Sequence, residues 1–366
     1  MYELFRPLLF RLEAERAHRL SMGAARLAQR VNPPFLSSMF DFGHGALGQT
    51  LWGRNFPNPV GLAAGFDKNA RLVRFWEKIG FGFVEVGSVT ACAAKGNKRP
   101  RAFRLPADRA IINRMGLNNQ GAEKIARRIH GLGGKRTMPL GINLAKTHDP
   151  TLVGDAAIED FRRSFQLLAP LADYIALNIS CPNTAEGKTF EEPEALDALL
   201  AVIFAERKEL RLGVPVLVKL APPLTPKVIF DSLVEELIDV AMAHGVHGFI
   251  ATNTASDRQG LTTPEDVLQR IGRGGLSGVP LAQRSTQLVR YLYRRIRGAV
   301  PIIGVGGIDS AEAAYTKLRA GASLVQLYTG LVYEGPSLVR HIKEGLVRLF
   351  EEDGVASIRE VVGLDA

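Results

Sequence analysis

Cysteine is almost absent from this chain, since its 366 residues include only Cys92 and Cys181. The two are far apart in the sequence and lack the spacing of metal ligands, so we expect neither a disulfide framework nor a metal site. No stretch approaches the roughly 20 apolar residues of a membrane-spanning helix. Arg6 and Arg11 interrupt the apolar N-terminus, which argues against a signal peptide. These absences favour a protein of a reducing compartment.

Acidic residues are outnumbered by basic ones, and the formal net charge is +9. Such a charge suits an anionic partner, for example a phosphate cofactor, an acidic substrate or an anionic membrane surface. No basic run with interleaved aromatic residues accompanies it, so we expect no nucleic-acid partner. Hydrophobic residues make up 46% of the chain, which is long enough to bury a full core.

The first 40 residues differ from the rest. Leucines recur every four residues from Leu4 to Leu12, and after His18 apolar residues continue at steps of three and four. Both patterns predict a helix with one apolar face. Such basic amphipathic helices either lie on a membrane surface or pack on the main domain. The chain therefore divides into an N-terminal two-helix amphipathic extension, residues 1–40, and a catalytic domain, residues 41–366.

From residue 58 onward, short apolar segments alternate with longer segments of helical periodicity. The expected strands cover residues 59–63, 82–88, 139–143, 174–179, 215–220, 247–252, 301–305 and 323–328. Eight strand–helix units with nearly continuous apolar strands predict an α/β fold, a closed (β/α)8 TIM barrel rather than an open sheet. An apparent hairpin at 47–56 would close the bottom of the barrel.

The segment Asn178-Ile179-Ser180-Cys181-Pro182-Asn183 directly follows the fourth expected strand. It brings a thiol, which can remove a proton, to a strand end between two carboxamides, which can bind a ring that carries amide groups. An inert cysteine in a turn is the alternative. Active sites of such barrels form at the carboxyl ends of the strands, so the other strand ends decide between the two interpretations.

Asparagines and glycines follow several other strands. Five asparagines fall at the same barrel mouth, which is typical of a site for a polar, amide-rich ring: Asn113, Asn143, Asn178, Asn183 and Asn253. Glycine lets backbone N–H groups approach an anion, and barrels of this kind often bind phosphate after strands 7 and 8. Any one glycine-containing pair could simply form a turn, but three such pairs in the last loops of the barrel favour a phosphate-binding site. They are Gly274-Gly275, Gly306-Gly307 and Thr329-Gly330.

Two lysines lie at strand ends. Lys219 ends the fifth strand and is costly to bury without an anionic partner. That partner is either the N1–C2=O edge of a flavin, which becomes negative on reduction, or a structural carboxylate. Lys68 follows a glycine turn and either binds a substrate carboxylate or is a solvated loop residue.

In combination, order and spacing, these motifs resemble dihydroorotate dehydrogenase, from the N-terminal helices to about residue 350. The matching segments are Gly61 to Asn69, Arg114 to Asn119, Asn178 to Asn183, Gly274 to Gly278 and Gly304 to Ile308. The extension, with Glu15-Arg16-Ala17-His18, resembles the class 2, quinone-dependent branch.

The resemblance implies FMN-dependent oxidation of (S)-dihydroorotate to orotate, a step of de novo pyrimidine biosynthesis, with a quinone as electron acceptor. Cys181 would be the catalytic base that takes the C5 proton, while hydride passes from C6 to flavin N5. Substrate contacts would come from Lys68, Asn113, Arg114, Met115, Gly116, Leu117, Asn178, Asn183, Asn253 and Thr254. FMN contacts would come from Ala64, Gly65, Phe66, Asp67, Lys68, Ser88, Asn143, Asn178, Lys219, Thr252, Gly278, Gly307, Tyr328 and Thr329.

The resemblance also implies a peripheral membrane protein, held by residues 1–40 at the cytoplasmic face of a bacterial inner membrane. Quinone would approach between these helices and the flavin, past His18, Arg104 and Tyr328. The base departs from the class 2 pattern, which usually has serine, whereas the soluble class 1 branch uses cysteine. A free thiol has a pKa of about 8.5, so its thiolate is accessible near neutral pH.

The loop after the base also departs from the class 2 pattern, at Thr184 to Lys188, as does Ala221-Pro222-Pro223. Among the alternatives, a soluble class 1 enzyme that uses fumarate or NAD is supported by Cys181 alone. A flavin-dependent dihydrouridine synthase would need an RNA-binding domain, for which we find no signal. A non-catalytic membrane adaptor would bind no flavin, and a nucleic-acid binder has only the net charge in its favour.

Overall fold

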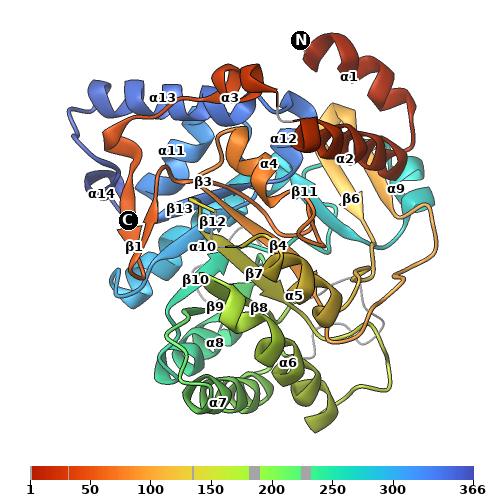
Figure 1. The fold of residues 1–366 in the computed structure, drawn as a ribbon, viewed down its shortest axis with the longest axis vertical. Helices are drawn as coiled ribbons and strands as arrows, with labels where there is room; N and C mark the ends of the chain where they lie inside the picture. The colour runs from red at the N-terminus through yellow and green to blue at the C-terminus, as the bar shows by residue number, and fades with distance from the viewer. Residues whose placement is uncertain (1, 32, 134–135, 181–189, 224–231) are drawn as a thin grey trace.

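A closed barrel of eight parallel strands forms the centre of the computed structural model (Figure 1). The structure describes residues 2–31, 33–133, 136–180, 190–223 and 232–366. In order around the barrel the strands are β3 (Val60–Leu62), β4 (Phe83–Val89), β7 (Leu140–Leu144), β8 (Tyr174–Asn178), β9 (Val216–Leu220), β10 (Gly248–Ala251), β12 (Ile302–Val305) and β13 (Leu324–Leu327). Each coincides with a predicted strand, so the TIM barrel is confirmed.

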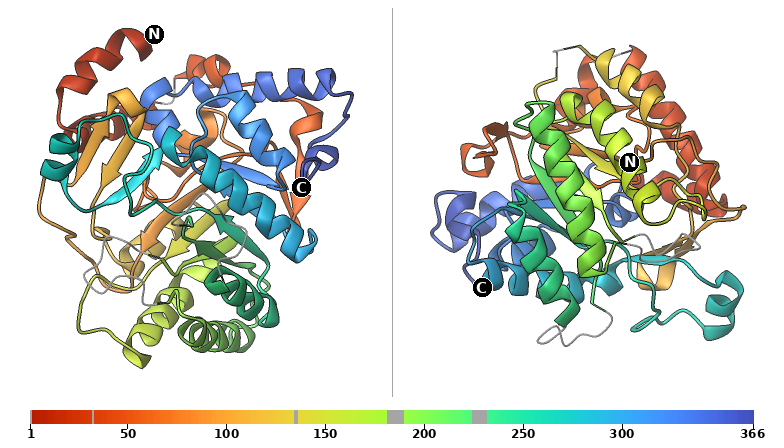
Figure 2. Two further views of the ribbon diagram at one scale, coloured as in Figure 1. Left: turned by 180° about the vertical axis from the view of Figure 1, so that it is seen from behind. Right: turned by 90° about the horizontal axis from the view of Figure 1, so that it is seen from below.

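Helices cover the outside of this barrel (Figures 1 and 2). They are α4 (Val73–Lys78), α5 (Ala122–His130), α6 (Asp155–Leu168), α7 (Pro193–Glu209), α8 (Ser232–Ala243), α10 (Ala282–Ile296), α11 (Ala311–Arg319), α12 (Thr329–Glu334), α13 (Leu338–Glu352) and α14 (Ile358–Val361). Helix α9 (Glu265–Ile271) lies apart from them, in a separate apolar cluster with Leu105, Ile112 and Leu276. Short 3-10 helices occupy Gly45–Leu47, Pro106–Asp108, Ala169–Leu171 and Val279–Leu281. Because both faces of the sheet are covered, barrel strands are buried along almost their whole length.

Two glycines make room for aromatic rings inside the barrel. A Cβ on Gly61 would lie 2.3 Å from the ring of Phe83, and one on Gly141 would lie 2.0 Å from the ring of Tyr174. Only glycine therefore lets these rings fill the lumen. Both rings are fully buried, and Tyr174 enters at the first residue of β8.

The predicted hairpin is confirmed as β1 (Gln49–Leu51) paired with β2 (Arg54–Phe56). Its turn carries Trp52, whose indole Nε1 donates a hydrogen bond of 2.8 Å to the carbonyl oxygen of His247, just before β10. The Trp52 ring also lies 5.7 Å from that of Tyr174, measured between centroids. The hairpin thus closes the amino-terminal end of the barrel, and ligands must enter at the opposite end.

A small antiparallel sheet, which the sequence analysis did not predict, stands beside the carboxyl end of the barrel. It consists of β5 (Ala102–Leu105), β6 (Ala110–Asn113) and β11 (Gly275–Gly278), from the segments after β4 and β10. Strands of four residues are too short for alternation to mark them. Gly274-Gly275 lies in the connection between β10 and α10, as predicted, and Gly275 begins the short strand β11 within that connection.

The N-terminal extension contains three helices, one more than predicted: α1 (Tyr2–Arg11), α2 (Ala14–Val31) and α3 (Pro34–Phe40). Pro34 begins α3, because proline is well tolerated in the first turn of a helix. Helix α2 packs against α4 and β5, and α1 packs against α12, on one side of the barrel mouth (Figure 1). No helix within the described ranges combines the length and apolarity needed to cross a membrane.

Candidate active site

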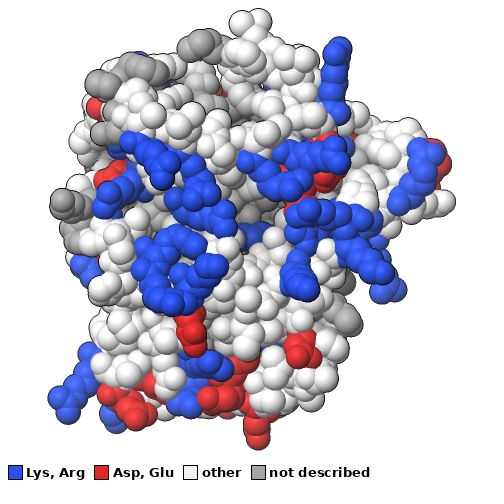
Figure 3. Space-filling view, turned by 45° about the vertical axis from the view of Figure 1, so that its right-hand side comes forward, with Lys and Arg blue, Asp and Glu red and all other residues white. Residues whose placement is uncertain are grey.

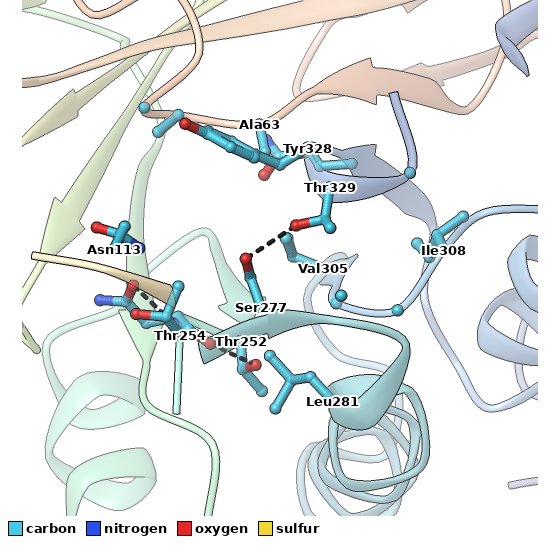
Figure 4. A pocket seen from close by; sticks show the side chains of 18 of the residues that line it. Ala63, Asn113, Thr252, Thr254, Ser277, Leu281, Val305, Ile308, Tyr328 and Thr329 are labelled. Carbon is cyan, nitrogen blue, oxygen red and sulfur yellow. Dashed lines mark hydrogen bonds between the residues drawn. The ribbon is translucent and has the colours of Figure 1, made fainter. Parts of the chain in front are cut away.

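One cavity opens at the carboxyl end of the barrel, between the strand ends and the small sheet (Figure 4). Most of the residues predicted for substrate or cofactor line it: Ala64, Gly65, Lys68, Ser88, Asn113, Met115, Gly116, Leu117, Asn178, Lys219, Thr252, Asn253, Thr254, Gly278, Gly307, Tyr328 and Thr329. These residues come from at least six different strands and loops, so only the closed barrel brings them together.

A chain of hydrogen bonds runs from this cavity into the barrel. Asn253 Nδ2 donates to Asn178 Oδ1 at 3.0 Å, and Asn178 Nδ2 donates to the hydroxyl of Ser88 at 3.1 Å. Ser88 in turn donates to Asn143 Oδ1 at 2.5 Å, and Asn143 Nδ2 donates to Glu85 Oε1 at 3.0 Å. Every donor in this chain points toward Glu85. Three of the predicted asparagines are therefore oriented by one carboxylate that the sequence analysis missed.

Glu85 is fully buried and accepts hydrogen bonds on both oxygens. Its Oε2 receives the hydroxyl of Tyr174 at 3.0 Å and Nε2 of Gln326 at 2.9 Å. Burial, together with the nearby Glu85 carboxylate, raises the pKa of Tyr174 well above its usual value, so the phenol keeps its proton and donates. The sequence feature that could have revealed Glu85 is its position as a single acid inside the apolar strand Phe-Val-Glu-Val, because a buried acid needs polar partners.

Lys219 lines the cavity and also has an ionic partner. Its Nζ lies 3.7 Å from Glu85 Oε1, and both side chains are almost completely buried. The sequence analysis left two possible anionic partners for Lys219, a flavin edge or a structural carboxylate, and the structure shows the carboxylate. The cavity-facing position leaves the ammonium available to a bound group as well.

Lys68 lies at the other side of the cavity, where its Nζ donates a hydrogen bond of 2.6 Å to Asn118 Oδ1. It is half-buried and held in place, so it is not a freely solvated loop residue. Burial, and then the positive charge of Lys68, lower the pKa of His18 to about 4. His18 is therefore neutral at physiological pH, and the only positive charge of this pair is on Lys68.

Glycines and hydroxyls gather at the end of the cavity near β12 and β13. Gly306, Gly307 and Gly330 line it, and the hydroxyls of Ser277 and Thr329 lie 2.8 Å apart there (Figure 4). Backbone N–H groups and hydroxyls are suitable donors for a phosphate group. Arg109 also lines this end, but it is paired with Asp309 at 2.8 Å and with Glu334 at 2.6 Å. Because of that pairing, a phosphate here would depend on the neutral donors.

Among the described residues predicted to contact substrate or FMN, four do not line the cavity: Phe66, Asp67, Arg114 and Asn143. Asp67 accepts the backbone N–H groups of Arg71 and Leu72 at 2.9 and 2.7 Å and so holds the start of α4. The guanidinium of Arg114 lies 4.7 Å from the centre of the Phe103 ring, on the small sheet. Both side chains are therefore held in place outside the lining of the cavity.

Cys181 and Asn183 lie outside the described residues. Ser180, the residue before Cys181, is buried, and both its carbonyl oxygen and its hydroxyl contact Asn253 Nδ2. The chain therefore leaves the described region directly beside the cavity.

A row of rings connects α2 with the cavity. The rings of His18 and Phe66 lie 5.0 Å apart, and those of Phe66 and Tyr328 lie 5.2 Å apart, between centroids. Burial raises the pKa of Tyr328 to about 12, so its phenol is neutral. Arg104 lies farther out, with its guanidinium 4.6 Å from the centre of the Phe10 ring and a hydrogen bond of 3.0 Å to the carbonyl of Leu9.

The chain is similar in sequence to known proteins of one family. The family model for dihydroorotate dehydrogenase matches residues 46–350. The chain is 45% identical over 365 residues to dihydroorotate dehydrogenase (quinone) of Gloeobacter violaceus, covering 99% of this chain and 98% of that protein. It is likewise 45% identical over 381 residues to the protein of that name from Deinococcus radiodurans, covering 99% and 100%.

A crystal structure of DHODH from Eimeria tenella in complex with ferulenol superposes with a TM-score of 0.85 at 34% identity, covering 96% of this chain and 95% of that chain. The superposition covers nearly the whole chain. The full-length relatives have the quinone-dependent name, and the resemblance seen in the motifs is confirmed. This chain belongs to the dihydroorotate dehydrogenase family, in its class 2 branch.

Proposed function

We propose that this protein oxidises dihydroorotate to orotate with bound FMN and passes the electrons to a membrane quinone. The observation that carries the proposal is the cavity itself, in which a row of carboxamides lies between two lysines at the carboxyl ends of the barrel strands. Carboxamides suit a ring that carries amide groups, and Lys68 suits its carboxylate. Full-length relatives named for the same reaction support it.

The cavity suits FMN on three counts. Gln326 lines the cavity, and its Oε1 is buried without a hydrogen-bond partner among the described residues, so it can accept from a ring N–H. Lys219 offers a positive charge to the N1–C2=O edge, while Ser277, Thr329 and Gly307 offer donors to the phosphate. When bound, FMN supplies the hydride acceptor of the reaction.

The chain's own residues would position the substrate and take its proton. Lys68 would bind the substrate carboxylate, and Asn113, Asn178, Asn253 and Thr254 would orient the ring. Cys181 would act as the base that removes the C5 proton, since a thiolate is accessible near neutral pH. Holding the base on one face of the ring and the acceptor on the other would make both transfers a matter of geometry.

Residues 1–40 would attach the enzyme to a membrane and admit the quinone. Six large apolar side chains on α1 and α2 are more than half exposed: Leu4, Phe5, Leu8, Leu20, Leu27 and Val31. Exposed apolar residues in such number mark an interaction surface. Exposed arginines accompany them on α2. Figure 3, which brings this side forward, shows groups of Lys and Arg across the middle of the face, while acidic residues are most numerous at its lower edge. Basic amphipathic helices of this kind bind anionic membranes.

The quinone would meet the flavin from the side of α2. The rings of His18, Phe66 and Tyr328 form the wall there, and the neutral phenol of Tyr328 can donate a hydrogen bond to a quinone carbonyl. Arg104, held against the carbonyl of Leu9, would mark the outer end of this approach.

Steady-state turnover of dihydroorotate with a soluble quinone analogue, with fumarate and with NAD tests the proposal. We expect a yellow protein whose flavin is bleached by dihydroorotate and is reoxidised by the quinone at least tenfold faster than by the other acceptors. A preference for fumarate or NAD would instead assign the protein to class 1 chemistry, which Cys181 alone favours. Colourless protein that does not bind added FMN would contradict the proposal altogether.

A further inference from the structure

We propose that Glu85 is a positioning residue of the flavin-binding pocket: it orients the amide side chains of the pocket and offsets the positive charge of Lys219. The inference rests on the proposed flavin site and adds to it a residue that does not line the cavity. Glu85 is at the third position of β4 and is fully buried in the barrel interior.

Four donors from four different strands converge on this carboxylate. Asn143 Nδ2 and Lys219 Nζ lie 3.0 and 3.7 Å from Oε1, while the Tyr174 hydroxyl and Gln326 Nε2 lie 3.0 and 2.9 Å from Oε2. An ionised carboxylate accepts on both oxygens, so it satisfies all four donors at once. Lys219 and Gln326 also line the cavity, and they are therefore held in place from behind.

The same carboxylate orients the amide chain above it. Asn143 must direct its NH2 group toward Glu85 and its oxygen toward Ser88, which in turn accepts from Asn178. Without a strong acceptor at the end of the chain, each amide could rotate by half a turn and exchange its donor and acceptor faces. Glu85 thereby determines which face of Asn178 meets a ligand.

The charge of Glu85 offsets the charge of Lys219. Two opposite charges in a water-excluded barrel act on their surroundings more strongly than they would in water. A ring that gains negative charge on reduction is stabilised by Lys219 and destabilised by Glu85. The pair thus limits how strongly the pocket favours the reduced cofactor, while keeping the buried lysine neutralised.

The test is the midpoint potential of bound FMN in Glu85→Gln, which keeps the shape and removes the charge. We expect reduced FMN to bind at least tenfold more tightly relative to oxidised FMN than in the wild type, which equals a rise of about 30 mV for a two-electron couple. Glu85→Asp keeps the charge and should restore the wild-type potential. Tyr174→Phe removes one partner of the same carboxylate without changing the charge, and it should leave the potential unchanged.

Removing one member of a buried pair can prevent folding, so a second comparison uses a background in which Lys219 is neutral. The potential of E85Q/K219Q should lie above that of K219Q, because the only charge of the pair has been removed. Equal potentials in both comparisons would overturn the role of Glu85. Failure of the wild-type apoprotein to bind FMN, seen as absent quenching of FMN fluorescence, would instead contradict the proposed function on which this inference depends.

Discussion

The barrel interior beneath the cavity and the N-terminal extension are built in opposite ways. At and below the floor of the cavity, Glu85, Lys219 and Asn143 are buried polar groups that satisfy one another among the apolar side chains of the barrel. On the extension, apolar residues such as Leu4 and Leu27 face outward, at 78% and 63% exposure. The barrel interior thus buries polar groups, whereas the N-terminal extension exposes apolar ones.

Attachment of the two regions differs accordingly. The barrel is held by its core, whereas α1 and α2 dock through a few apolar contacts, such as Ala25 on the core and Phe10 on Tyr333, together with polar ones. Glu15 on α2 pairs with Arg101 at 2.9 Å and with Arg99 at 3.0 Å, and Arg6 and Tyr2 on α1 bond to carbonyl groups of α12. If the exposed apolar side chains contact a membrane, as proposed, these contacts with the barrel domain hold the helices in place. The comparison therefore predicts that chemistry and quinone access can be damaged separately.

The largest effect that we expect comes from replacing Cys181, and it falls on the chemical step. If this thiol is the base, Cys181→Ala should slow flavin reduction by dihydroorotate by about 10² to 10⁴-fold, the usual contribution of general base catalysis. Stopped-flow bleaching of the flavin measures this step without quinone. Cys181→Ser is the matched control, because its higher pKa should shift the pH–rate profile to higher pH. Bleaching of the alanine variant at the wild-type rate would rule out the thiol as base.

Glu15→Gln should detach the second region and leave the first intact. The substitution leaves buried Arg101 without its carboxylate, which costs about 3 kcal/mol of docking free energy. Flavin reduction by dihydroorotate should stay at the wild-type rate, while reoxidation by quinone and resistance of α2 to proteolysis fall. Glu3→Gln, an exposed acid on α1, serves as control. Equal loss of both half-reactions would show that the regions are not separable.

His18, which lies on α2 next to Lys68 of the cavity, should make the stability of the folded protein depend on pH. Burial, then Lys68, lower its pKa in the folded protein to about 4, whereas an unfolded histidine titrates near 6.5. The unfolded chain binds the extra proton between these values, so this contribution to stability is complete above pH 6.5 and is lost as the pH falls toward 4.

We therefore expect His18→Gln to flatten the acid side of the stability profile, by up to about 3 kcal/mol between pH 7 and pH 4. Urea unfolding at several pH values measures it. His130→Gln, at an exposed site on α5, is the control and should keep the wild-type slope. Parallel profiles for wild type and His18→Gln would refute the assignment.

Leu4→Ser with Leu8→Ser should have the smallest effect, and only on the second region. Both side chains are exposed, so the free energy of unfolding should change by no more than about 0.5 kcal/mol per site. Binding to anionic vesicles should fall about tenfold, because each leucine would bury apolar surface in the lipid. Val153→Ser, which is also exposed but lies on the barrel, is the control in vesicle flotation. Unchanged binding would favour another docking surface.

Much of the barrel could be predicted because its strands are short apolar segments at regular intervals, and their ends carry recognisable motifs. Lys68, Asn178 and Thr329 were found in this way, and they line one cavity. The small sheet escaped prediction because four-residue strands carry too little periodicity. Arg114 and Asp67 belong to the right motifs, but the sequence does not show which way a side chain points.

By itself the sequence determined the eight-stranded barrel, the motif order at its mouth and the amphipathic pattern of residues 1–40, since each follows from local periodicity and spacing. Only the tertiary structure decided that Glu85, from β4, meets Lys219 from β9 and Gln326 from β13. It also decided that the apolar residues of α1 and α2 face outward. The physical reason is that barrel closure brings together strands separated by more than a hundred residues, and no local pattern encodes which side chains then share a carboxylate.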